Sequence, residues 1–176
     1  MELSILFLPL IASIISGFFG KYIGDRNSEI VTSALVSISA LLSIFVLYQV
    51  IVNQYEENIV IATWINSGSL DVNWSMLIDP LSAVMLVVVT SVSSLVHIYS
   101  IGYMSHDPHK PRFMAYLSLF TFAMLMLVTS DNFIQLFFGW EGVGLCSYFL
   151  IGFWFKIGRA HVRTPVTEKS RMPSSA

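Results

Sequence analysis

An acidic residue, Glu141, lies close to the middle of an apolar run that extends from Phe133 to Phe155. Ionisable side chains at such a depth in a bilayer are costly, and they commonly mark ion or proton pathways. Burial disfavours the charged form of a carboxyl group, whereas a nearby lysine favours it, so a small movement of that lysine would load or release a proton. We interpret Glu141 as a candidate proton carrier. The alternative is a polar residue that only holds helices together.

Two further residues are secondary candidates for proton transfer. Helical spacing places Tyr148 on the same face as Glu141, together with Gly144 and Gly152, whose small size would let another helix approach closely. His97 lies near the end of an earlier apolar run. Histidine titrates near neutral pH, so His97 is either a proton relay or a hydrogen-bonded residue between helices.

The sequence offers no sign of a bound cofactor or metal. The four histidines and the single cysteine are too widely spaced to form a ligand cluster, and no glycine-rich phosphate loop follows a strand. Hydrophobic residues make up 55% of the 176 residues and charged residues only 11%, against about a quarter charged in typical globular domains. This composition indicates lipid as the solvent and no nucleic-acid partner.

Five apolar runs are long enough, or nearly so, to cross a bilayer, which takes about 20 residues in a helix. All are expected to be helices, because an isolated strand in lipid would leave its backbone polar groups unpaired. Prolines and capping residues at several of their starts agree with this interpretation. The expected spans are approximately residues 3–22, 30–52, 80–103, 113–129 and 133–155.

The connection between the second and third spans has a pattern of its own. Apolar and polar residues alternate from Leu70 to Met76, as in a half-buried strand. Turn-forming residues at 66–69 and a partner strand at Ile61–Ile65 complete a small β-hairpin. The sequence therefore predicts an all-α membrane protein of about five transmembrane helices with this hairpin on its extracytoplasmic face. There it would cover helix ends or contact a neighbouring subunit.

The charges of the connections predict the orientation in the membrane. The connections on one side carry Lys21, Arg26, Lys110, Arg112 and Lys156. Those on the other side carry no lysine or arginine, and their acidic residues are Glu2, Glu56, Glu57, Asp71 and Asp131. Basic connections stay on the cytoplasmic or matrix side of a membrane. The chain is therefore expected to be a multi-pass protein with its N-terminus on the outer side.

The segment 157–176 differs from the rest, because its apolar content falls and basic residues appear in a short stretch. The strings IGRAHV at 157–162 and SRMPSSA at 170–176 look like the translation of a sequencing adapter. We interpret this tail as a cloning or assembly artefact and leave it out of the fold prediction. The alternative is a native disordered basic tail, which sequencing of the genomic locus would reveal.

One motif resembles a known family. Residues 139–148, Gly-Trp-Glu-Gly-Val-Gly-Leu-Cys-Ser-Tyr, resemble the chain 5 (L-type) subunits of NADH:quinone oxidoreductase, and Ile78–Ser82, His97–Met104 and Arg112–Tyr116 support the resemblance. It covers roughly residues 1–155. It implies long bundles of transmembrane helices in which two inverted repeats form the proton path. In that family the glutamate matching Glu141 is a proton-path residue, coupled to a lysine two spans later.

The resemblance implies a membrane subunit of respiratory complex I, an H⁺-translocating NADH:ubiquinone reductase of the bacterial or mitochondrial inner membrane. NADH, flavin, iron–sulfur clusters and quinone would then be bound by partner subunits, and this chain would contact other membrane subunits, lipid and protons. The coupled lysine and the second repeat are not in this sequence, so we expect no pumping by it alone. The alternatives are the large subunit of a multi-subunit Na⁺/H⁺ antiporter or membrane-bound hydrogenase, and a structural membrane bundle without transport.

Overall fold

The structure is a computed structural model that describes residues 1–68 and 70–154. In this part of the chain the helices are α1 (Glu2–Ile23), α2 (Asp25–Asn53), α3 (Pro80–Tyr103), α4 (Lys110–Val128) and α5 (Phe133–Ile151), with strands β1 (Glu57–Ser67) and β2 (Leu70–Ile78) between α2 and α3. All five helices are long and apolar enough to cross a membrane. The predicted five membrane-length helices and the small β-hairpin between the second and the third are confirmed. The tail at 157–176 lies outside the described residues.

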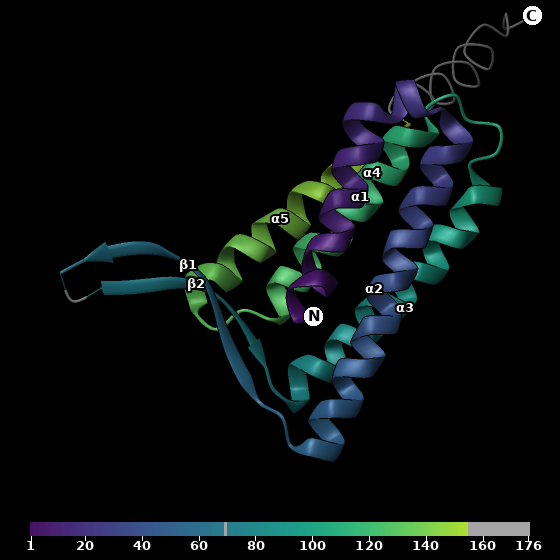
Figure 1. The fold of residues 1–176 in the computed structure, drawn as a ribbon. Coiled ribbons are helices and arrows are strands. Elements are labelled where there is room, and N and C mark those ends of the chain that lie inside the picture. Colours follow the sequence, from purple (N-terminus) through teal and green to yellow (C-terminus); the bar gives the residue numbers. More distant parts are fainter. Residues whose placement is uncertain (69, 155–176) are drawn as a thin grey trace, which may run out of the picture.

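Helix α4 is the centre of the bundle. It packs against α1, α2, α3 and α5, while α2 also packs against α1 and α3. In Figure 1, α5 lies on one side of the bundle and the long α2–α3 pair lies on the other. The shared core lies where α1 to α4 meet β2, and its fully buried members include Ile5, Val46, Met76, Leu86 and Leu125. The outer position of α5 leaves one of its faces free.

The ends of the helices follow from local chemistry. Asp79 accepts a hydrogen bond from the Ser82 backbone N–H at 2.6 Å, and the Ser82 hydroxyl accepts one from the Asp79 N–H at 2.8 Å. This reciprocal capping starts α3 beside Pro80. Helix α2 begins at Asp25, earlier than the expected residue 30, because Gly24 adopts a φ of +87° and joins α1 directly to α2. Residues 25–29 therefore belong to α2 and not to a connection between helices.

The predicted β-hairpin is present and is longer than expected. Its strands pair antiparallel from Glu57 opposite Ile78 to Ser67 opposite Leu70, and the turn uses Gly68 with a φ of +62°. The hairpin projects away from the helices in Figure 1. An aromatic cluster joins the hairpin to α5, since the ring centroid of Trp74 lies 4.8 Å from that of Trp64 on β1 and 4.9 Å from that of Phe138 on α5.

A buried glutamine fixes β2 to α5. The side-chain oxygen of Gln135 accepts a hydrogen bond from the Ser75 N–H at 3.0 Å, and its amide nitrogen donates one to the Ser75 carbonyl at 2.6 Å. Both residues are 1% exposed. Both backbone polar groups of Ser75 therefore form a hydrogen bond with this one side chain.

We expect Gln135→Leu to release the hairpin from α5. Each backbone group of Ser75 that stays buried without a partner costs about 1–3 kcal/mol. The measurement is limited proteolysis of the complete protein in detergent, where cleavage within β2 should become faster. Gln49→Leu is the matched control, because Gln49 is a half-buried glutamine of α2 that forms no side-chain hydrogen bond to the hairpin within the described residues. Equal cleavage rates in the two variants would contradict the expectation.

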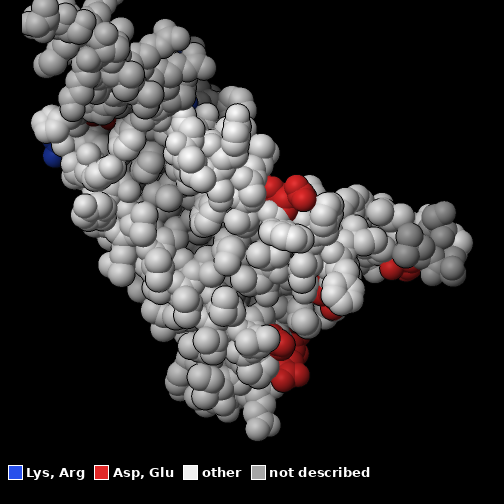
Figure 2. Space-filling view, turned by 180° about the vertical axis from the view of Figure 1, so that it is seen from behind, with Lys and Arg blue, Asp and Glu red and all other residues white. Residues whose placement is uncertain are grey.

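The charged side chains separate along the length of the molecule. Figure 2 shows most of the visible acidic side chains over the hairpin and the helix ends beside it, and a basic side chain at the opposite end. The basic residues of the two short connections, Lys21 and Arg26 between α1 and α2 and Lys110 and Arg112 at the start of α4, belong to that opposite end. The compartment that each end faces stays a prediction.

Candidate functional site

Helix α5 has one packed face and one free face. On the packed face, Gln135, Gly139 and Cys146 are buried. Gly139 allows the close contact with α4, because a Cβ atom at this position would lie only 2.8 Å from the backbone of Leu127. Gly142 lies on the same side, where a Cβ atom would meet Ala123 at 3.2 Å. Small residues thus decide which face of α5 turns toward the bundle.

Glu141 lies on the free face of α5. Its side chain is exposed, and it forms no ion pair with any residue that the structure describes. At Gly144, one turn further along, a Cβ atom would meet nothing within 4 Å, so this face has room for a neighbour. A charged group in the middle of a membrane span normally faces other protein or a water-filled cavity rather than lipid. We therefore expect Glu141 to face further protein or a water-filled cavity rather than lipid when α5 spans a membrane.

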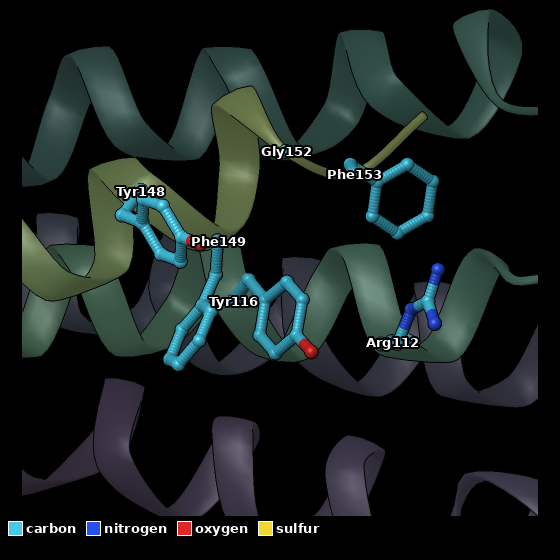
Figure 3. A pocket seen from close by; sticks show the side chains of 6 residues that line it. All are labelled: Arg112, Tyr116, Tyr148, Phe149, Gly152 and Phe153. Carbon is cyan, nitrogen blue, oxygen red and sulfur yellow. The ribbon is translucent and has the colours of Figure 1, made fainter. Parts of the chain in front are cut away.

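Tyr148 shares this free face and is 72% exposed. It comes two helical turns after Glu141, which corresponds to about 10 Å along the helix axis. Its ring lines a cavity of about 380 Å³ between α4 and α5. Figure 3 shows Tyr116 and Arg112 reaching into the same space from α4. The structure thus brings Tyr148 and Glu141 to one face, at different depths.

The same cavity contains a cation at the basic end of the bundle. The Arg112 guanidinium lies 4.8 Å from the centroid of the Phe153 ring, a cation–π contact. Nearby, the indole of Trp154 donates a hydrogen bond to Asp107 at 2.7 Å. Burial raises the pKa of Asp107. The hydrogen bond from Trp154 and a second one from the His109 N–H together lower the pKa by more, so it lies below the ordinary value. These contacts tie the loop before α4 to the end of α5.

His97 lies in a different place, fully buried where α3 packs on α4. Its Nδ1 lies 2.7 Å from the Ser93 carbonyl oxygen, and its Nε2 lies 3.0 Å from the Ser118 hydroxyl. An imidazole that donates from Nδ1 to a carbonyl can accept at Nε2 from a hydroxyl, so both ring nitrogens are satisfied in the neutral form. Because Glu141 points away from α4, the structure does not bring these two residues together.

We expect His97→Phe to destabilise the contact between α3 and α4. The phenyl ring fills a similar space but leaves the Ser118 hydroxyl without its partner, which costs about 1–3 kcal/mol in a buried site. The midpoint of thermal unfolding of the complete protein in detergent should fall. His106→Phe, in the exposed loop after α3, should leave the midpoint unchanged. A similar midpoint in both variants would contradict this role.

Sequence reasoning missed one buried acid, Glu29. The second span is expected to begin at residue 30, which leaves Glu29 in the connection, whereas the residue lies within α2 and is only 4% exposed. Its oxygen Oε1 lies 3.9 Å from Nζ of Lys110. A signal was present, because the polar residues Ser28, Thr32, Ser33, Ser39 and Ser43 recur at helical spacing through an apolar run. Such a stripe marks a buried polar face.

Among the described residues, no group of three or more histidine, cysteine, aspartate or glutamate side chains is placed to hold a metal ion. The described side chains that can bind or pass on a proton are carboxyl groups, a histidine and hydroxyls. These side chains lie in two separate places. One is on the free face of α5, and the other is buried among α2, α3 and α4.

Two family models match the chain. One, described as the N-terminus of chain 5 of NADH-ubiquinone oxidoreductase (complex I), matches residues 64–114. The other, described as the transmembrane region of NADH:quinone oxidoreductases and Mrp antiporters, matches residues 130–162. The second match includes Glu141 and Tyr148, and the first includes His97.

Similar curated proteins are named NADH-ubiquinone oxidoreductase chain 5. The protein of Phytophthora infestans is 55% identical over 153 residues, which cover 87% of this chain and 23% of the relative. The protein of Arabidopsis thaliana is 57% identical over 155 residues, which cover 88% and 23%. The protein of Dictyostelium discoideum is 49% identical over 150 residues, which cover 85% and 22%. The chain thus spans less than a quarter of the length of these relatives.

Proposed function

This chain belongs to the family of chain 5 subunits of NADH-ubiquinone oxidoreductase, and from this we propose that it forms part of a membrane subunit that translocates protons. In the proposal, the complete protein moves protons across the membrane while partner subunits oxidise NADH and reduce quinone. The five membrane-length helices agree with a multi-pass membrane subunit. The proposed activity is that of the complete protein in its complex.

The free face of α5 is the observation that supports this proposal most. It carries the Glu141 carboxyl within a membrane-length helix, and Gly144 leaves space beside it for another helix. Packing of a further helix there would bury the carboxyl and raise its affinity for a proton, whereas an approaching cation would lower that affinity. A movement of the cation would then bind and release a proton at Glu141. Tyr148 would extend the path along the same face.

The proposed surroundings follow from the charges and the family. The end of the bundle with Lys21, Arg26, Lys110 and Arg112 would face the cytoplasm or the mitochondrial matrix, and the N-terminus and the hairpin the outer side. The membrane would be the inner membrane of a bacterium or of a mitochondrion. The proposed partners are other membrane subunits of complex I, with NADH, flavin, iron–sulfur clusters and quinone bound elsewhere in the assembly.

A second candidate function is the large subunit of a multi-subunit Na⁺/H⁺ antiporter, because the family model that matches residues 130–162 also describes Mrp antiporters. Transport assays in membrane vesicles distinguish the two. Proton uptake that starts on addition of NADH and stops with an inhibitor of quinone reduction supports the complex I function. Proton release that depends on added Na⁺ and not on NADH supports the antiporter and contradicts our proposal.

A further inference from the structure

Two charged side chains meet inside the basic end of the bundle. Glu29 of α2 and Lys110 at the start of α4 have side-chain exposures of only 5% and 19%. Their closest oxygen and nitrogen atoms are 3.9 Å apart, which is too long for a hydrogen bond. Removing two charges from water is unfavourable, and the attraction between them offsets this cost only with good geometry and further hydrogen bonds. Within the described residues, the Glu29–Lys110 pair has no close contact geometry, and Oε1 of Glu29 has no hydrogen bond to protein.

Two buried oxygens at this place are unpartnered. Within the described residues, neither Oε1 of Glu29 nor the Ser33 hydroxyl has a hydrogen-bond partner, although the two residues are 4% and 6% exposed. They are four residues apart in α2 and so lie on one face, one turn from each other. Buried polar atoms are almost always bonded to protein or to ordered water. Water beside Glu29 and Ser33 would satisfy both oxygens and bridge Glu29 to Lys110.

A column of hydroxyls continues from this point into the bundle. The Ser37 hydroxyl lies 2.7 Å from that of Ser94, and further along the Ser43 hydroxyl lies 2.8 Å from that of Thr90. His97 is three residues after Ser94 on α3 and bonds to Ser118 of α4. From Glu29 to Ser43 the rise along α2 is about 21 Å, which is a large part of the ~30 Å thickness of the hydrocarbon core.

Hydroxyl pairs between membrane helices often serve only to hold the helices together. That role explains the Ser43–Thr90 pair, whose members are both satisfied. It does not explain an ionisable group with an unpaired oxygen at the head of the column. Besides Lys110, the charged groups that act on Glu29 are Asp25 and Arg26 in the preceding turn of α2. From α1, the neighbouring polar group is the uncharged Ser16, which bonds to Ser28 and to the Pro111 carbonyl.

We propose that Glu29 is a hydrated proton-exchange site, separate from Glu141, through which protons pass between the basic face of the bundle and the hydroxyl column between α2 and α3. The Glu29 carboxylate takes a proton from a hydronium ion on the basic side, so an O–H bond of that ion breaks, an O–H bond forms on the carboxyl, and a water molecule is left. That bond breaks when the proton moves to the water beside Ser33. The charge of Lys110 favours this release. The site rests on the proposed proton translocation, and Lys110 acts as a positioning residue.

The test uses the complete protein, assembled in its complex and reconstituted in vesicles. Glu29→Gln keeps the shape of the side chain and removes its exchangeable proton. Because water can partly replace the carboxyl, we expect NADH-driven proton uptake to fall about tenfold, less than the ~100-fold or more that a positioned proton-transferring group typically contributes. Infrared spectra recorded during acidification should also lose one carboxylic-acid C=O band. Glu56→Gln, at an exposed position, should keep normal uptake.

Normal proton uptake in Glu29→Gln would overturn the proposal. Reduced uptake with every carboxylic-acid band retained would also overturn it, because Glu29 would then act only as a structural charge. If Glu29→Gln does not assemble, the double variant Glu29→Gln/Lys110→Gln removes both charges together. Reduced uptake in this double variant supports the proposal, and normal uptake overturns it. A failure of the proposed function is recognised separately. In that case Glu141→Gln would keep normal proton uptake, and its infrared spectrum would still contain the band of Glu29.

Discussion

Replacing Glu141 with glutamine in the complete protein is expected to reduce NADH-driven proton translocation by about 100-fold, the lower range for loss of a positioned proton-transferring group. Glutamine has the same shape as glutamate and still forms hydrogen bonds, but it cannot bind and release a proton. Glu141 is on the free face of α5, so the contacts between α4 and α5 at Gly139 and Cys146 stay unchanged. The measurements are the pH change in vesicles after addition of NADH and the amount of complex on a native gel.

The control for Glu141→Gln is Glu57→Gln, which makes the same chemical change at an exposed position on β1. It should assemble and translocate protons normally. A Glu141→Gln protein with full proton translocation would identify Glu141 as a polar contact between helices, and the transport function of this face would be wrong. A protein that fails to assemble would indicate that the carboxyl stabilises the packing of the helices that cover α5.

Replacing Gly139 with alanine is expected to separate α5 from α4. The added Cβ atom would lie 2.8 Å from both the Cα and the N atom of Leu127, and backbone atoms in a helix cannot turn aside as a side chain can. Overpacking of this kind costs about 1–3 kcal/mol. We expect a lower midpoint of thermal unfolding and less assembled complex, because α5 carries Glu141 and also holds the base of the hairpin through Gln135.

The same substitution elsewhere should have the opposite effect. At Gly102, in the last turn of α3, an added Cβ atom meets nothing within 4 Å. Gly102→Ala removes the helix penalty of glycine, which is about 1 kcal/mol in an exposed helix interior and smaller near an end. Its unfolding midpoint should stay equal or rise slightly. Equal midpoints for Gly139→Ala and Gly102→Ala would show that the close contact between α4 and α5 is not as the structure places it.

Two polar regions of the molecule have different expected roles. The free face of α5 presents an exposed carboxyl with open space beside Gly144, so its chemistry depends on what packs there. The hydroxyl pairs between α2 and α3 lie within the described residues, and Glu29 and Lys110 lie at the basic end of these helices. Loss of Glu141 should therefore impair transport even when the infrared band of Glu29 is unchanged, and the two variants report on separate sites.

Local sequence patterns were enough to predict the number and approximate limits of the helices, the hairpin and the position of Glu141 within a span. These features are local. A run of about 20 apolar residues must cross lipid as a helix whatever its neighbours are, and period-two alternation from Leu70 to Met76 indicates a strand from that segment alone. The sequence predicts a start of α2 at residue 30, which is later than the observed start. The positive φ of Gly24 replaces the expected loop between α1 and α2, and an apolar pattern does not reveal such a backbone angle.

Only the tertiary structure decided which residues from distant segments meet. It showed that Gly139 contacts Leu127, that His97 is satisfied by Ser118, and that the free face of α5 is the one with Glu141. It also placed Glu29 beside Lys110, 81 positions away in the sequence (110 − 29), in a buried site. The physical reason is that hydropathy measures only how strongly a side chain avoids water. Packing between helices depends on side-chain shape and on hydrogen bonds between helices. The spacing of residues along one helix gives no information about these contacts.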